Sequence, residues 1–192
     1  MGNVLDLGCG RNKYPGAIGA DLNPATAADV LCDLSRPPYP FRNSSFSEVR
    51  AVHLVEHVEN VIRFMEEVHR LLRPGGKLYL VTPHYTDSGS FRDPTHRWHL
   101  NSYSFYYFTE PRDYGFYSPV RFREQRVILR LLKLWRWLGF EWLVNHSRSF
   151  RKLWEHYLCF VIRGKEMHFW FEAIKSAAAS PSSLGWETAR HS

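Results

Sequence analysis

A strand–helix–strand pattern occupies residues 48–82. Two short apolar runs, at residues 48–54 and 77–82, flank a stretch in which apolar residues recur at helical spacing while charged residues fill the opposite face. Pro74-Gly75 ends this helix ahead of the second run. Two strands that are joined through a helix run parallel, with a right-handed crossover. The pattern therefore predicts an α/β fold built around a parallel sheet.

Further apolar runs extend the predicted sheet on both sides. The three earlier runs are short and stop at turn residues, as strands do when a loop follows. We expect one α/β domain over residues 1–175, with a mostly parallel seven-stranded sheet whose last strand is antiparallel, and a disordered tail at 176–192. The other strands are expected at residues 3–7, 17–20, 29–32, 121–131 and 166–175, with a helical segment at 132–163.

Composition excludes several classes of protein. The chain has 192 residues, 44% of them hydrophobic, and no uncharged apolar run reaches the ~18 residues that a membrane-spanning helix needs. The N-terminus lacks the basic and apolar regions of a secretory signal. The 3 cysteines are too few and too scattered for a disulfide framework or a zinc ribbon. We therefore expect a cytoplasmic protein.

The net charge of +6 is concentrated in one block. Residues 112–165 carry 12 basic and 4 acidic side chains, which indicates either an anionic partner or a solvated face. Within this block, residues 126–163 mix arginine and lysine with tryptophan and leucine. This mixture is typical of a helix on an anionic membrane and also of a helix that covers a sheet. We favour the interpretation that this segment covers the sheet, and we expect at most weak contact with a membrane surface. We expect no nucleic acid as a partner, because no known nucleic-acid module is present.

A glycine loop follows the first predicted strand. Gly8-Cys9-Gly10 permits positive φ angles and lets the backbone approach a ligand closely. Asp21 ends the second strand, where it can accept hydrogen bonds from the hydroxyls of a ribose. Asp33 ends the third strand, where it can accept one from the amino group of an adenine. Ligands of open α/β sheets bind at the carboxyl ends of the strands, so these groups are expected in one site.

Four stretches of the chain resemble the class I S-adenosylmethionine-dependent methyltransferases, most closely the small type-11-like group. They read VLDLGCG, GADLNP, DVLCDLSRPPYPFRNSSFSEVRAVHLVEHV and VHRLLRPGGKLYLVTPH, and they lie within residues 3–84. The resemblance implies a Rossmann-like methyltransferase fold, S-adenosylmethionine as the cofactor and methyl transfer as the activity. It also implies cofactor contacts from Asp6, Gly8, Cys9, Gly10, Asp21, Leu22, Cys32, Asp33, Leu34 and His53.

The chain departs from that family's pattern after the glycine loop. Asn12 stands where a third glycine is usual, and only residues 11–16 separate the loop from the second strand, so the first helix must be very short or absent. A dinucleotide site is disfavoured, since its fingerprint needs a glycine at Lys13. Because the chain begins at the first strand, we expect another segment to cover the cofactor, unless the start is truncated. The alternative from another functional class is a non-catalytic or membrane-peripheral protein that kept the sheet and lost the cofactor.

Residues 85–117 form a long polar and aromatic insertion after the fifth strand, at the edge where acceptors bind. We predict that this insertion is a lid that folds over the cofactor and forms most of the acceptor pocket. If the acceptor is a hydroxyl, a general base assists its methylation. We predict that His96 is this base and that Asp93 sets its tautomer, with His84 as the alternative base. Asp93 capping a turn is the competing interpretation. The aromatic residues at 103–117 are expected to line the acceptor pocket, to pack on the sheet, or both.

Metal-assisted transfer is a further alternative. His84, Asp93, His96 and His99 offer imidazole and carboxylate ligands, but their spacing matches no known metal signature, and no metal site is predicted. His53 and His57 span a strand-to-helix junction and are not expected to share a face, so neither is interpreted as a ligand. The preferred function is O-methylation of a small-molecule or saccharide acceptor.

Overall fold

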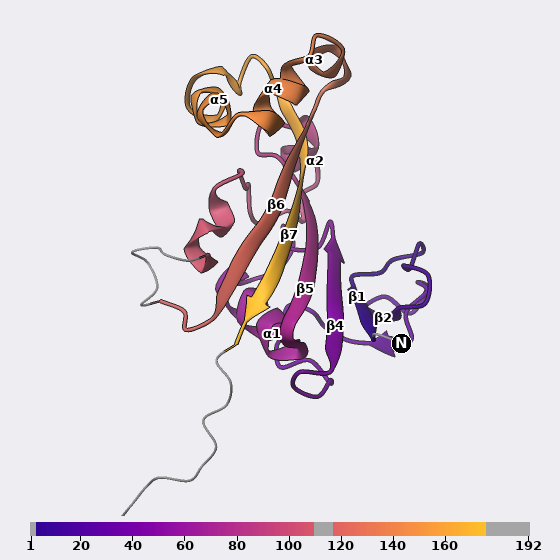
Figure 1. The fold of residues 1–192 in the computed structure, drawn as a ribbon. Coiled ribbons are helices and arrows are strands. Elements are labelled where there is room, and N and C mark those ends of the chain that lie inside the picture. Colours follow the sequence, from indigo (N-terminus) through magenta and orange to yellow (C-terminus); the bar gives the residue numbers. More distant parts are fainter. Residues whose placement is uncertain (1–2, 110–116, 176–192) are drawn as a thin grey trace, which may run out of the picture.

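One seven-stranded sheet organises the fold (Figure 1). The computed structural model describes residues 3–109 and 117–175, so the expected disordered tail lies outside the described residues. The strands are β1 (Val4–Leu7), β2 (Ile18–Asp21), β3 (Val30–Leu31), β4 (Phe46–Val52), β5 (Leu72–Pro83), β6 (Arg121–Leu131) and β7 (Gly164–Ile174). The helices are α1 (Val61–Leu71), α2 (Ser88–Arg92), α3 (Lys133–Trp137), α4 (Phe140–His146) and α5 (Arg148–Leu153), with a 3-10 turn η1 (Ser104–Phe108) and a π turn η2 (Trp154–Leu158).

The strand order places a switch point at β1. The sheet runs β3-β2-β1-β4-β5-β7-β6, so the chain builds outward from β1 first in one direction and then in the other. The first five strands pair in parallel, and β7 runs antiparallel to both of its neighbours, β5 and β6. This confirms the predicted mostly parallel sheet with an antiparallel last strand. A crevice for a ligand is expected where β1 and β4 end, because their connections leave in opposite directions.

Helix α1 confirms the amphipathic pattern, although it is shorter than the periodic stretch. Asn60 begins the helix, and its side-chain oxygen accepts a hydrogen bond from the Arg63 amide at 3.0 Å. The buried face contains Phe64, Met65, Val68 and Leu71. Burial of such side chains stabilises the fold by about 1.5–3 kcal/mol each, so packing on the sheet, rather than helix propensity, holds α1 in place.

The long strands alternate between a buried face and a partly exposed face. On β7, Phe169 and Phe171 are buried, and Phe105 of the insertion packs against Phe169 with ring centroids 4.8 Å apart. At least part of the aromatic cluster therefore packs on the sheet, as one of the two interpretations predicted. On the opposite face the guanidinium of Arg50 lies 4.3 Å from the centre of the Tyr79 ring, a cation–π contact.

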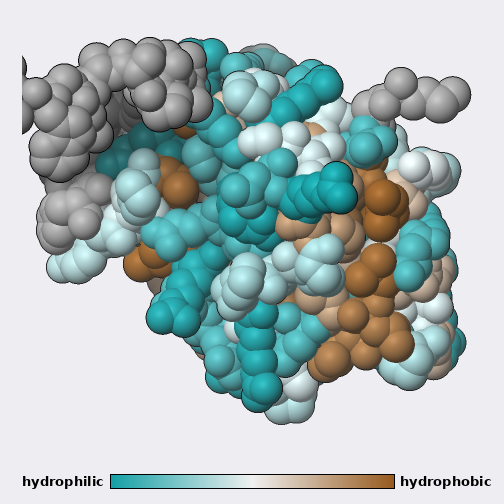
Figure 2. Space-filling view, turned by 90° about the horizontal axis from the view of Figure 1, so that it is seen from below, coloured by the Kyte–Doolittle hydropathy of each residue, from teal (hydrophilic) through white to brown (hydrophobic). Residues whose placement is uncertain are grey.

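The connection between β1 and β2 contains no helix. Residues 8–17 are all described, and none of them is helical, which confirms the expectation of a very short or absent first helix. Without that cover, Ile18 stays 38% exposed on β2 and Leu31 stays 60% exposed on β3. Figure 2 shows apolar surface on the side of the molecule where the N-terminal strands lie.

Helices α3 to α5 and the turn η2, here called the α3–η2 block, lie beyond one end of β6 and β7 (Figure 1). The expectation that this segment covers the sheet is confirmed only in part, since Trp135, Phe140, Phe150 and Leu158 are half-buried against the core. Helices α3 and α5 bury no residue, while Val144 of α4 and Trp154 of η2 are the apolar side chains that the block places in the core. Trp137 is 83% exposed. None of the described helices is long and apolar enough to cross a membrane.

Candidate functional site

A cavity of about 560 Å³ opens at the carboxyl ends of β1, β2 and β4; we call it the cofactor cavity. Its volume lies in the range of small-molecule sites. Six of the residues predicted to contact the cofactor line it: Gly8, Asp21, Leu22, Asp33, Leu34 and His53. These residues lie close together because the carboxyl ends of parallel strands all lie at one edge of the sheet.

The glycine loop shapes one wall of this cavity. Gly8 has φ +67° and Gly10 has φ +53°, left-handed conformations that strongly favour glycine. A Cβ atom built on Gly8 would stand 3.1 Å from the Leu54 side chain. The Gly10 amide donates a hydrogen bond to Oδ2 of Asp21 at 2.9 Å, and the Asn23 amide donates to Oδ1 at 3.0 Å. These contacts hold the Asp21 carboxylate at the rim of the cavity.

The other predicted cofactor residues support the loop from behind. Asp6, Cys9, Gly10 and Cys32 do not line the cofactor cavity. Asp6 is buried, and its Oδ2 accepts a hydrogen bond from the Tyr14 amide at 2.7 Å. Burial raises the pKa of Asp6 above its ordinary value, against the opposing effect of that hydrogen bond and of Arg50. In this structure Asp6 therefore fixes the connection between β1 and β2.

The cavity has the features that S-adenosylmethionine needs. Gly8 offers backbone without a side chain beside a ligand, and Asp21 and Asp33 place two carboxylates on the wall. The carboxylate of Asp33 is 37% exposed and so remains accessible to a ligand. The residues that line the cavity therefore fit this cofactor.

A group of histidines forms the side of the cavity that follows β4. His53 lines the cavity and has φ +53°, an uncommon conformation for a non-glycine residue that costs about 1–3 kcal/mol. Its Nδ1 lies 3.2 Å from Oε1 of Glu56, a carboxylate that is 1% exposed. The hydrogen bond to Glu56 raises the pKa of His53 above its ordinary value, although burial opposes the shift. Such strain and pKa perturbation are commonest at functional sites.

The insertion meets this histidine side of the cavity. The Arg97 amide donates to the Glu56 carbonyl at 2.7 Å, and the indole of Trp98 donates to the Val58 carbonyl at 2.8 Å. These bonds bring Thr95 to the cavity wall. Thr95 is the one described residue of the predicted lid that lines the cofactor cavity.

The predicted Asp93–His96 pair is not a hydrogen-bonded pair. Nε2 of His96 lies 3.9 Å from Oδ2 of Asp93, which is too long for a hydrogen bond. The Nδ1–H of His96 instead donates to the Ser90 carbonyl at 3.0 Å. Asp93 accepts from the Thr95 amide at 2.9 Å and from the Thr95 hydroxyl at 2.7 Å, so it caps a turn. The tautomer of His96 is thus set by a backbone carbonyl and not by Asp93.

His84, the alternative base, points away from the cavity. Its side chain is fully buried, and Nδ1 accepts a hydrogen bond from the Thr86 amide at 3.3 Å. The proton therefore sits on Nε2, which donates to Glu155 at 3.3 Å. Both ring nitrogens are occupied, so His84 has no lone pair left for an acceptor or a metal. His99 stacks on Phe91 with ring centroids 3.9 Å apart, so the four-residue metal set does not come together.

Six residues that line the cavity were not predicted to contact the cofactor. They are Asn23, Ser35, Leu54, His57, Val58 and Thr95. Five of these directly follow a predicted contact or lie in the connection between β4 and α1, so their position after a strand end could have identified them. Thr95 comes from the insertion, and no local pattern in the sequence places it there.

Comparison with known proteins identifies the family. A family model described as a methyltransferase domain matches residues 1–172. The chain belongs to this methyltransferase family. S-adenosylmethionine is the cofactor that membership implies, in agreement with the fit of the cavity. The fold agrees as well: a methyltransferase dependent on S-adenosylmethionine from Archaeoglobus fulgidus matches with a TM-score of 0.61 at 15% identity, covering 90% of this chain and 86% of that one.

A second solved structure shares the fold, and a curated relative matches part of the chain. A putative methyltransferase from Bacillus halodurans matches with a TM-score of 0.58 at 15% identity, covering 91% of this chain and 94% of that one. A demethylmenaquinone methyltransferase from Chlorobaculum parvum is 33% identical over 93 residues, which is 41% of this chain and 36% of that protein. The chain therefore spans little more than a third of the length of this curated relative.

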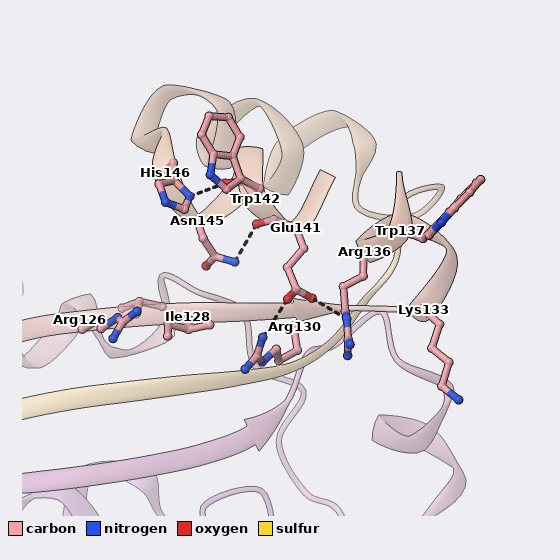
Figure 3. A pocket seen from close by; sticks show the side chains of 11 residues that line it. Arg126, Ile128, Arg130, Lys133, Arg136, Trp137, Glu141, Trp142, Asn145 and His146 are labelled. Carbon is pink, nitrogen blue, oxygen red and sulfur yellow. Dashed lines mark hydrogen bonds and ion pairs between the residues drawn. The ribbon is translucent and has the colours of Figure 1, made fainter. Parts of the chain in front are cut away.

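A larger cavity of about 820 Å³ lies elsewhere in the molecule, between β6 and helices α3 and α4 (Figure 3). Arg126, Arg130, Lys133 and Arg136 line it together with Trp137 and Trp142. Arg130 pairs with Glu141 at 2.9 Å. Because β6 is the edge strand farthest from β2 and β3, this basic cavity is separate from the cofactor cavity. Size alone does not make it the reaction site, since it lacks the glycine loop and the strand-end carboxylates.

Proposed function

We propose that the protein transfers a methyl group from S-adenosylmethionine to a hydroxyl oxygen of a small-molecule or saccharide acceptor. The single observation that supports this most is the group of histidines at the open side of a cavity that fits the cofactor. The cofactor supplies an electrophilic methyl group, and transfer is an in-line displacement. The chain's contribution is to align donor and acceptor, exclude water and accept a proton from the hydroxyl.

The proposed cofactor contacts divide into two groups. Asp21 and Asp33 accept hydrogen bonds from the ribose and the adenine, and Leu22 and Leu34 cover the apolar faces between them. Gly8 lets the methionine part of the cofactor approach the backbone. Asp6, Cys9, Gly10 and Cys32 act behind this surface by holding the loops, rather than by touching the cofactor.

The proposed acceptor side is formed by His53, His57 and Thr95, with His96 in ring contact with His57 at 4.6 Å between centroids. We propose that the imidazole of His96 is the general base, oriented by the Ser90 carbonyl rather than by Asp93. The partial match to a demethylmenaquinone methyltransferase supports a small-molecule acceptor, since that relative is named for one.

Replacement of His96 tests this assignment. His96→Ala is expected to lower turnover by about 10²–10⁴-fold while leaving S-adenosylmethionine affinity unchanged, because a group acting on the acceptor does not touch the donor. His146→Ala, an exposed histidine on α4, is the control and should change neither value. Turnover is measured by screening hydroxylated acceptors with labelled cofactor. An unchanged turnover in His96→Ala would remove His96 from the reaction.

One further observation favours a second role, contact with an anionic membrane surface. The α3–η2 block leaves apolar side chains exposed next to basic ones: Trp137 is 83% exposed, Trp142 60%, and Lys133 and Arg136 line the same cavity (Figure 3). Tryptophan beside lysine and arginine is the composition of interfacial helices, and charge complementarity selects anionic lipid as the occupant.

Vesicle co-sedimentation tests this contact. The protein is expected to bind vesicles that contain phosphatidylserine, to bind less as salt shortens the Debye length below about 10 Å, and to ignore neutral vesicles. Trp137→Ala combined with Trp142→Ala should abolish binding. Leu31→Ala should not, although Leu31 of β3 is as exposed as Trp142. Equal binding by both variants would refute a role for the α3–η2 block.

A further inference from the structure

Three potential metal ligands converge at the wall of the cofactor cavity. Glu56 and His57 belong to the connection between β4 and α1, and His96 belongs to the insertion. Each offers one ligand atom, and these atoms all lie within 4.8 Å of one another. Among residues 3–109 and 117–175 this is the one group of its kind. His57 also lines the cavity, so the cluster adjoins the cofactor cavity through this residue.

The carboxylate of Glu56 points independently to a bound group. Its side chain is almost fully buried, and Oε1 is in contact with His53. Oε2 is also buried and has no hydrogen-bond partner. A buried polar atom without a partner costs about 1–3 kcal/mol, and a charged one costs more. A cation bound at this oxygen would remove that cost.

Both imidazoles present an unprotonated nitrogen. The Nδ1 of His96 faces the Ser90 carbonyl, which can only accept, so the proton sits on Nδ1 and leaves a lone pair on Nε2. The Nδ1 of His57 lies 2.9 Å from the Thr95 hydroxyl, which already donates its single proton to Asp93. The hydroxyl therefore accepts from His57, and Nε2 of His57 also keeps its lone pair. Metal-binding histidines typically show this arrangement, with the second ring nitrogen donating to a carbonyl or to a carboxylate-linked group.

We propose that Glu56, His57 and His96 bind a divalent transition-metal ion. Two imidazoles and one carboxylate form a set that suits Zn²⁺, Co²⁺ or Fe²⁺ and leaves coordination positions open. Metal–ligand bonds of ~2.0–2.2 Å require the three ligand atoms to approach to about 3–3.5 Å, so a modest closure of the side chains accompanies binding. His57, which also lines the cofactor cavity, connects the proposed metal site to that space.

The catalytic role of the ion rests on the proposed O-methylation. Binding of the ion to Glu56, His57 and His96 does not depend on that proposal. An acceptor hydroxyl bound to the ion has a lowered pKa and is held in a fixed direction. His57 and His96 then bind the ion, and the hydroxyl proton is released to water as the O–CH₃ bond forms and the S–CH₃ bond breaks. In this ion-bound form His96 is a ligand and not the base assigned to it above. Asp93, Thr95 and Ser90 become positioning residues, because they orient the imidazoles without contacting the ion.

The experiment measures metal binding with the metal alone. The full chain is stripped with a chelator and titrated with Co²⁺, whose visible absorption reports its ligands, and Zn²⁺ is then added in competition. One Co²⁺ per chain is expected. Glu56→Gln, which keeps the shape of the side chain, and His96→Ala should each remove the signal, and Thr95→Val should weaken binding by about 10–100-fold as a lost orienting partner does. The control His146→Gln on α4 should bind normally.

The outcomes separate this inference from the proposed function. Absence of a Co²⁺ signal in the wild type, or a signal that persists in both Glu56→Gln and His96→Ala, overturns the metal site. Circular dichroism of each variant distinguishes loss of a ligand from loss of the fold. Acetohydroxamate, a bidentate oxygen ligand, should shift the Co²⁺ spectrum if positions are open, and an unchanged spectrum would overturn the role toward an acceptor. Failure to find any methyl acceptor leaves these spectra unaffected and counts only against O-methylation.

Discussion

Replacing Asp21 by alanine is expected to weaken S-adenosylmethionine binding while the fold persists. The Asp21 carboxylate stands at the rim of the cofactor cavity, fixed by the Gly10 and Asn23 amides at 2.9 and 3.0 Å. Each oxygen retains lone-pair capacity toward the cavity. Removal leaves the ribose hydroxyls without charged acceptors, at a cost of about 1–3 kcal/mol. That cost corresponds to a roughly 5–150-fold rise in Kd.

Asp21→Ala could also weaken cofactor binding indirectly, by loosening the glycine loop that the carboxylate holds. The chain offers a matched control for this indirect effect. Asp29 is also a carboxylate; it directly precedes β3 and accepts a backbone hydrogen bond from the Gly19 amide of β2 at 2.7 Å. It pairs with Lys13 at 2.7 Å and does not line the cofactor cavity. Asp29→Ala should therefore disturb the local backbone in a similar way while leaving S-adenosylmethionine affinity unchanged.

Isothermal titration calorimetry of the wild type and both variants measures the three affinities, and thermal unfolding reports their stabilities. Equal affinity in the wild type and Asp21→Ala would exclude Asp21 from the cofactor site. Equal losses in Asp21→Ala and Asp29→Ala would show that the loop, and not a direct contact, controls binding. Either result refutes the assignment of the ribose to Asp21.

Two further predictions concern the loop and the core. Gly8→Val should abolish S-adenosylmethionine binding, because a branched side chain at this positive φ meets Leu54. The control Gly16→Val also has a positive φ but lies in open space, so it should still bind the cofactor in calorimetry. Equal binding by the two variants would contradict the role of Gly8. Glu155→Ala should lower the free energy of unfolding by about 2–6 kcal/mol, because two buried donors, from His84 and the Ser102 amide, lose their acceptor. Burial raises the pKa of Glu155, but these hydrogen bonds outweigh it and hold the pKa below the ordinary value. Glu155 therefore stabilises the fold above its unfolded pKa, and this stabilisation is lost as pH falls through the folded pKa. The difference in the free energy of unfolding between the wild type and Glu155→Ala should therefore shrink in acid, which denaturant unfolding at several pH values measures.

Local patterns predicted the N-terminal half of the fold well. The amphipathic stretch of α1 and the short apolar runs around it are set by neighbouring residues, and burial of one face fixes their arrangement on the sheet. The same logic located Gly8, Asp21 and Asp33, since each stands where a parallel strand ends. The packing of the α3–η2 block was predicted only in part, because its spacing predicts helices but does not say whether Trp137 faces the sheet or solvent.

The sequence by itself determined the α/β sheet, the glycine loop and the carboxylates at the strand ends, because periodicity and turn chemistry act over a few neighbouring residues. Only the tertiary structure decided how the histidines are arranged. His57 and Thr95 are 38 residues apart and meet because the insertion is hydrogen-bonded to the end of the β4–α1 connection. Which nitrogen of His96 is free follows from the Ser90 carbonyl. Contacts of this kind depend on where two distant backbones cross, and no local pattern in the chain encodes that.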